Sequence, residues 1–178
     1  MTIHENLAEF AGRPVVAYAP PMALRDAGAT AWRIAVDWDA HDAGTRFSDV
    51  VGPLLEDPAA ENIAALVIGD WGGTGTGNDS APVVEALVAA SERLANLTAL
   101  FLGEMTVEES EISWINQSDV SPLFAAYPKL RELWIRGGGG LSLGRPQHDC
   151  LKKVVIETGG LPGSVVRELG TARLPALE

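Results

Sequence analysis

The sequence predicts an α/β solenoid, with parallel strands in sequence order and helices on the outer face. Two observations carry this prediction. The first is the apolar pattern L-x-x-L-x-L-G at Leu97–Gly103, which recurs along the chain. The second is that apolar residues at helical spacing fill the stretches between its copies. The further copies lie at Ala31–Val36, Ile63–Gly69, Leu130–Ile135 and Leu151–Ile156.

Each copy joins a short strand to a following helix, which is the unit of a leucine-rich repeat. The first four central residues are 32 to 34 residues apart, and the last two intervals are 21 and 23. The long intervals leave room for a full outer helix, and the short ones lie in the usual range of about 20–29. The alternative is an ordinary parallel sheet with right-handed crossovers, whose strand order differs from sequence order. The central residues are Ile34, Leu66, Leu100, Leu133, Val154 and Leu177.

The chain is expected to divide into an N-terminal cap, residues 1–30, and one continuous domain of repeats, residues 31–178. A cap is needed because the first repeat has no neighbour to cover its core. Within it, Glu5–Phe10 is expected to form one or two helical turns. Pro14–Tyr18 is expected as a strand, since a proline at its start removes no needed donor.

Helices are expected where apolar residues recur at helical spacing after a strand. Pro82 suits the start of the second helix, because proline is tolerated in the first turn. Pro58 and Pro128 limit the first and third. The expected helical ranges are residues 47–55, 80–94, 118–127 and 164–169.

Over residues 30–178 the pattern resembles leucine-rich-repeat proteins. More narrowly, Glu109–Ile115, Ser121–Leu123 and Leu133–Gly138 are similar to a group of bacterial leucine-rich-repeat proteins of unassigned function. This resemblance implies an interaction scaffold without catalysis. The Asn or Cys that usually follows the strand is not regular here, so the turns depart from the family pattern.

Composition and charge restrict the function. The 178 residues have a net charge of −11, so nucleic acid, which needs a basic surface, is not an expected partner. Cys150 is the only cysteine, so no disulfide forms within the chain and a reducing compartment fits. The chain shows no signal-like start and no apolar run long enough for a membrane span. We therefore expect a cytoplasmic protein without a membrane partner.

The predicted binding site is the concave strand face. In each strand, the residue between the last two apolar positions points to this face, and parallel strands place these residues in one row. Apolar and aromatic residues bordered by charges are typical of protein interaction sites. The alternative is that loops or the N-terminal segment cover the row. The row is Ala35, Val67, Phe101, Trp134 and Val155, and the expected partner contacts are Val67, Phe101, Trp134, Glu132, Arg136 and Val155.

A second hypothesis is an enzyme or small-ligand protein. The glycine-rich loop Gly72–Gly77 and the acidic loop 104–111 follow consecutive strands, so they should be neighbours and frame a pocket. The phosphate-loop and dinucleotide fingerprints are absent, and the acidic spacing matches no cation loop. The adjacent residues His148, Asp149 and Cys150 rarely converge on one metal. We therefore predict no enzyme activity, no metal and no cofactor.

The last residues, Leu174–Glu178, begin another copy of the motif and stop within it. Two expectations follow, because the last strand of a solenoid presents an unpaired edge. One is that the chain is a piece of a longer repeat array. The other is self-association through this end, most simply by a two-fold antiparallel contact between edge strands that buries Val155, Ile156 and Leu177.

Overall fold

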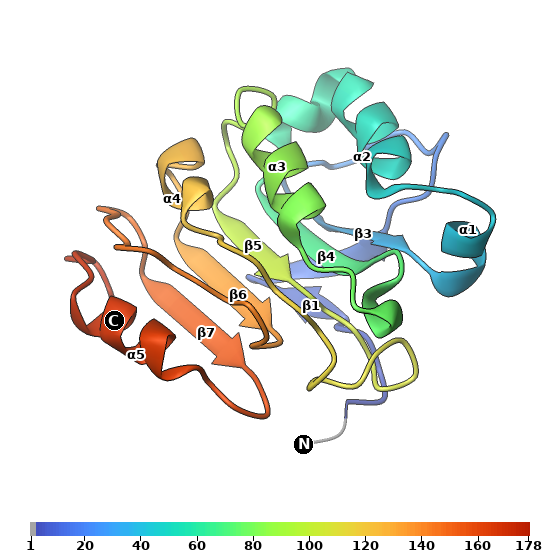
Figure 1. Cartoon of the computed structure of the whole chain (residues 1–178). Helices are drawn as coiled ribbons and strands as arrows, with labels where there is room; N and C mark the ends of the chain where they lie inside the picture. Colours follow the sequence, from blue (N-terminus) through green and yellow to red (C-terminus); the bar gives the residue numbers. More distant parts are fainter. Residues whose placement is uncertain (1–2) are drawn as a thin grey trace.

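The computed structural model describes residues 3–178 as a curled seven-stranded sheet with helices on one face (Figure 1). Strand order equals sequence order, from β1 to β7. Strands β2 to β7 pair in parallel, so the predicted strand order is confirmed and reordered crossovers are excluded. The solenoid itself stays a prediction. Strands β1 and β2 are instead an antiparallel hairpin. There the prediction of parallel strands is wrong, because Ala11 and Gly12 both adopt positive φ and form a tight turn.

The elements lie close to the expected ranges, with shorter helices in the middle of the chain. The strands are β1 (Glu9–Phe10), β2 (Arg13–Ala17), β3 (Ala31–Val36), β4 (Ala65–Trp71), β5 (Ala99–Leu102), β6 (Glu132–Arg136) and β7 (Lys153–Glu157). The helices are α1 (Trp38–Asp42), α2 (Phe47–Glu56), α3 (Ala81–Ala89), α4 (Pro122–Ala126) and α5 (Gly163–Gly170), with 3₁₀ turns η1 (Pro58–Asn62) and η2 (Thr74–Thr76). Within residues 3–178, no helix is both long and apolar enough to cross a bilayer.

The expected helical turns at Glu5–Phe10 are absent. This segment is extended and ends in β1. Its backbone groups are bonded to distant partners: the N–H of Leu7 donates to the Glu104 carboxylate at 2.9 Å, and the carbonyl of Ala8 accepts from Val15 at 2.9 Å. These tertiary bonds replace the local bonds of a helix.

Strands β4 to β7 are aligned as the repeat pattern predicts, but β3 is shifted. Arg33, not Ala35, pairs with Val67, and the register changes between Ile34 and Val36. The pairing from Ala31 to Ile34 thus differs by two residues from the predicted one, which keeps the alternation of faces. A charged side chain therefore takes the row position predicted for alanine. The central residues that do align across β4–β7 are Leu66, Leu100, Leu133 and Val154.

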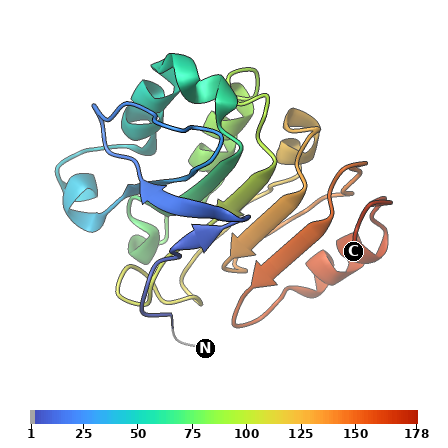
Figure 2. The ribbon, with the colours of Figure 1, turned by 180° about the vertical axis from the view of Figure 1, so that it is seen from behind.

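The sheet is covered on both faces over part of its width. One face packs against α2 to α5 and forms the large apolar core. The opposite face carries a second, smaller core under the N-terminal hairpin, which crosses the strands in the reverse view (Figure 2). Strands β6 and β7 extend beyond the hairpin. The small core contains Phe10, Ala31, Ala65, Val67, Ala99 and Phe101.

The C-terminal residues continue a bonding pattern seen at the start of earlier strands. The carbonyl of Thr98 accepts from Arg131, and the carbonyl of Arg131 accepts from Lys152. In the same way, the carbonyl of Lys152 accepts the N–H of Glu178 at 2.9 Å. Leu177 remains 46% exposed. Self-association through this end stays a prediction.

We predict that Phe10→Ala destabilises the fold by about 3–5 kcal/mol, the usual cost of removing a buried phenylalanine side chain. Phe10 is 3% exposed and packs against the rings of Phe101 and Trp134. Urea unfolding followed by tryptophan fluorescence measures the loss. Val16→Ala in the same hairpin is the control, since Val16 is 38% exposed. Equal losses in the two variants would contradict the role given to Phe10.

Candidate functional site

The predicted row of strand-face residues is present from β4 to β7. Val67 pairs with Phe101, Phe101 with Trp134, and Trp134 with Val155. Because the side chains of a parallel sheet alternate between faces in register, these four lie side by side on one face. The sequence therefore located the row, apart from its β3 member.

The N-terminal hairpin covers half of this row. Phe10 lies 5.9 Å, centroid to centroid, from both Phe101 and Trp134. Val67 and Phe101 are fully buried beneath the hairpin. The expectation that these two residues contact a partner is therefore wrong, because a segment of the chain itself occupies the face. This outcome matches the alternative of an N-terminal cover for that part of the row.

Arg136 is also committed to internal contacts. It is 4% exposed, and its Nε donates to Glu157 Oε2 at 2.7 Å. Its Nη1 donates to the carbonyl of Met105 at 2.6 Å, and its guanidinium carbon lies 5.1 Å from the centre of the Phe101 ring. The expectation that Arg136 contacts a partner is not met, because these contacts enclose the guanidinium.

The part of the strand face that the hairpin covers least lies on β6 and β7, and we call it the open strip: Glu132, Trp134, Lys153 and Val155. Within it, Trp134 still packs against Phe10 of the hairpin. Glu132, Trp134 and Val155 are partly buried, and Lys153 is exposed. The Lys153 Nζ lies 4.7 Å from the centre of the Trp134 ring. Lys153 was not among the expected contacts, although its pairing with Glu132 follows from the same repeat register.

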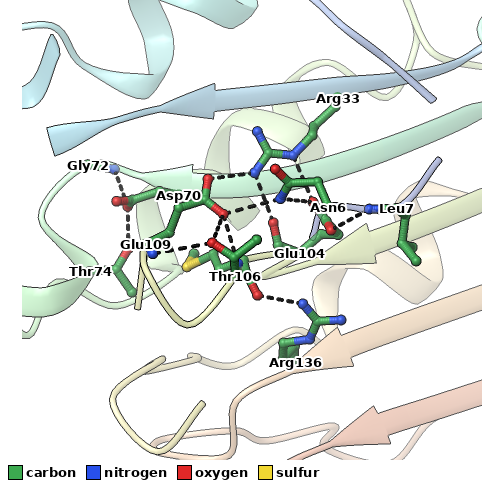
Figure 3. A network of polar contacts seen from close by, with 11 residues as sticks. Asn6, Leu7, Arg33, Asp70, Gly72, Thr74, Glu104, Thr106, Glu109 and Arg136 are labelled. Atoms are coloured by element: carbon green, nitrogen blue, oxygen red, sulfur yellow. Dashed lines mark hydrogen bonds and ion pairs between the residues drawn. The ribbon is translucent and has the colours of Figure 1, made fainter. Parts of the chain in front are cut away.

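A buried polar network ties the N-terminal segment to the acidic loop (Figure 3). Glu104 is fully buried, and one of its oxygens accepts from Arg33 Nε at 2.7 Å and from Asn6 Nδ2 at 3.1 Å. Its other oxygen accepts the N–H of Leu7 at 2.9 Å. A buried carboxylate of this kind needs both an opposite charge and further donors. The network supplies both.

Glu109 completes the network from the same loop. Its Oε1 accepts from Arg33 Nη2 at 2.8 Å, and its Oε2 accepts the N–H of Thr106 at 2.8 Å. Burial acts to raise the pKa of Glu109, but the Thr106 N–H and the Arg33 charge outweigh it, so the pKa lies below its usual value. Burial acts to lower the pKa of Arg33, yet its two carboxylate partners raise it. Two of the four glutamates of the acidic loop, Glu104 and Glu109, are thus paired with Arg33 within the chain.

The glycine-rich loop lines a cavity of about 480 Å³, but the acidic loop does not. Gly72 borders this cavity together with His41, Arg46, Trp71 and Asp79. Asp70 at the end of β4 accepts the N–H of Gly72 at 2.9 Å, which fixes the first turn of the loop. The predicted pocket framed by both loops is therefore present only on the glycine side.

The sequence His148–Asp149–Cys150 does not form a metal site. His148 is buried, with its Nε2 2.9 Å from the carbonyl of Tyr127 and its Nδ1 accepting the N–H of Cys150 at 3.2 Å. Both ring nitrogens are thus bonded to the backbone, whereas a ligand needs one of them free. Over residues 3–178, no group of three or more His, Cys, Asp or Glu residues is placed to hold a metal ion.

The fold is shared with a bacterial protein of known structure. The crystal structure of a protein from Bacteroides fragilis matches this chain with 35% sequence identity and a TM-score of 0.73. The match covers 82% of this chain and 40% of that chain, so this chain spans less than half the length of the solved one. No protein-family model and no curated protein matches the sequence. The similarity therefore supports the curled α/β sheet.

We predict that Glu104→Ala destabilises the fold by about 3–5 kcal/mol, because it removes one partner of a buried ion pair. Arg33 has 12% of its side chain exposed and would keep only Glu109 as a charged partner. Urea unfolding at neutral pH measures the change. Glu108→Ala, which removes an exposed carboxylate beside His4, is the matched control and should have little effect. Similar losses in both variants would exclude the proposed anchoring role.

Glu109 should make the fold sensitive to acid. Its pKa is lower in the folded chain than its ordinary value of 4.5, so its contribution to stability is present above about pH 4.5. That contribution is lost as the pH falls through the folded pKa. In Glu109→Gln, the free energy of unfolding should be smaller at pH 7 and should decline less below pH 4.5. Chemical denaturation across this range tests the idea, with exposed Glu5→Gln as the control. An unchanged acid profile in Glu109→Gln would refute it.

Proposed function

We propose that the chain is a non-catalytic protein-binding module that uses the open strip on β6 and β7. The observation that carries this proposal is the partial cover of the strand face. The N-terminal hairpin shields β4 and β5 and leaves Trp134, Lys153 and Val155 accessible in part. An aromatic and an aliphatic side chain, bordered by Lys153 and Glu132, have the composition of a small interaction surface.

Within this proposal, the sheet is the strand layer of leucine-rich repeats. The in-register pairing of β4 to β7 and the helices on the opposite face support this interpretation. Repeat proteins of this kind use their strand face for binding. The contact set proposed here is Glu132, Trp134, Lys153 and Val155. It keeps three of the residues expected from sequence and replaces the buried ones with Lys153.

The proposal predicts that Val155→Glu weakens partner capture without unfolding the chain. Val155 is only partly buried, and a carboxylate there would face an apolar partner surface without compensation. Tagged wild type and variant are used to recover partners from the cells that make the protein, with quantification by mass spectrometry. A loss of tenfold or more in specific partners is expected, equivalent to about 1.4 kcal/mol.

Val166→Glu is the matched control, because Val166 is 56% exposed on α5, away from the strand face. It should retain the partners that Val155→Glu loses. Circular dichroism establishes that both variants are folded. If the two variants recover the same partners at wild-type levels, or lose them equally, the open strip is not the binding site.

A further inference from the structure

The cavity beside the glycine-rich loop has the size and position of a small-molecule site. It lies at the carboxyl ends of β3 and β4, between α1 with the start of α2 on one side and the start of α3 on the other. Its volume of about 480 Å³ falls within the range of about 300–1,000 Å³ that is usual for such sites. Ligands of open α/β sheets commonly bind at this end of the strands. The cavity is separate from the open strip on β6 and β7.

The floor of the cavity is apolar and held in place by hydrogen bonds. Phe47 and Trp71 are both buried, and Pro82 and Ala86 of α3 complete the apolar lining. The indole N–H of Trp71 donates to the carbonyl of Asn78 at 3.2 Å, and the Asn78 side chain donates to the carbonyl of Gly72 at 3.0 Å. The floor is therefore formed before any ligand arrives.

His41 packs directly on the glycine-rich loop and shapes the wall of the cavity. A Cβ at Gly72 would lie 2.9 Å from His41 Nδ1, and one at Gly73 would lie 2.8 Å from His41 Nε2. Both glycines also have positive φ, of 91° and 73°. The close approach therefore requires glycine at both positions, and it brings the imidazole to the cavity edge.

Two opposite charges line the cavity without neutralising each other. Within the described residues, neither Arg46 nor Asp79 takes part in an ion pair, although both border the same space. Asp79 uses one oxygen to accept the N–H of Ala81 at 2.9 Å. Asp49 accepts the backbone N–H of Arg46, not its guanidinium. The cavity thus offers one cation and one anion above an apolar floor.

We propose that this cavity binds a free apolar α-amino acid. The ligand carboxylate pairs with Arg46, whose guanidinium suits a carboxylate, and the ligand ammonium pairs with Asp79. The ligand side chain lies on Phe47 and Trp71. A purely anionic ligand would face Asp79 and a purely cationic one would face Arg46, so a zwitterion satisfies both groups. This inference is independent of the protein-binding proposal.

The test compares three probes that differ only in their charged groups: L-phenylalanine, 3-phenylpropionate without the ammonium, and 2-phenylethylamine without the carboxylate. Calorimetric titration of the 178-residue chain should show that L-phenylalanine binds at least about tenfold more tightly than either analogue. In Arg46→Gln, L-phenylalanine should no longer bind more tightly than 2-phenylethylamine. Asp79→Asn keeps the oxygen that accepts the Ala81 N–H. In this variant, L-phenylalanine should no longer bind more tightly than 3-phenylpropionate.

Arg25→Gln and Asp42→Asn serve as controls, because they remove exposed charges outside the cavity lining. Both should keep the wild-type preference for L-phenylalanine. The proposal is overturned if folded wild type binds none of the three probes at millimolar concentration. It is equally overturned if the three bind alike, or if the preference survives in both Arg46→Gln and Asp79→Asn.

Discussion

The buried ion pair between Arg33 and Glu104 determines which part of the strand face is available. Glu104 joins three separate parts of the chain, because it accepts from Arg33 on β3 and from Asn6 and Leu7 ahead of β1. This anchor fixes the N-terminal segment at one edge of the face. The hairpin that follows then places Phe10 over Phe101, so a polar contact controls the burial of an apolar row.

Much of the sheet could be predicted from sequence, since the apolar period of the strands directly reports which residues face the core. The β3 register could not be read from the motif alone, because β3 pairs with β4 two residues away from the alignment of the motif, which places Arg33 in the row. The sequence did contain a signal for the correct register of β3. Aligning Trp32 with Leu66 gives the same interval of 34 residues that separates Leu66 from Leu100. The position of the N-terminal hairpin depends on contacts between residues distant in sequence, and local sequence patterns do not predict such contacts.

The candidate sites show the same division between local pattern and tertiary contact. The sequence located the strand face, but only the packing of Phe10 distinguishes buried Phe101 from partly exposed Trp134. From sequence, the acidic loop is expected to be a solvated run of glutamates. In the structure, Glu104 and Glu109 instead form ion pairs with Arg33. The same attraction fixes this loop in the network under the N-terminal segment. The cavity is therefore bordered by Gly72 of the glycine-rich loop but by no residue of the acidic loop.

The partial cover of the sheet creates a gradient of stability along it. Every residue of β4 and β5 is buried, with packing on both faces, whereas β7 has no fully buried residue. Local opening costs least where apolar contacts are fewest, so we expect opening to be easier at β7 than at β4 and β5. The open strip lies across this gradient, with Trp134 on the more buried strand and Lys153 on the less buried one. A partner bound there would bridge the two and suppress the fluctuations of the sheet edge.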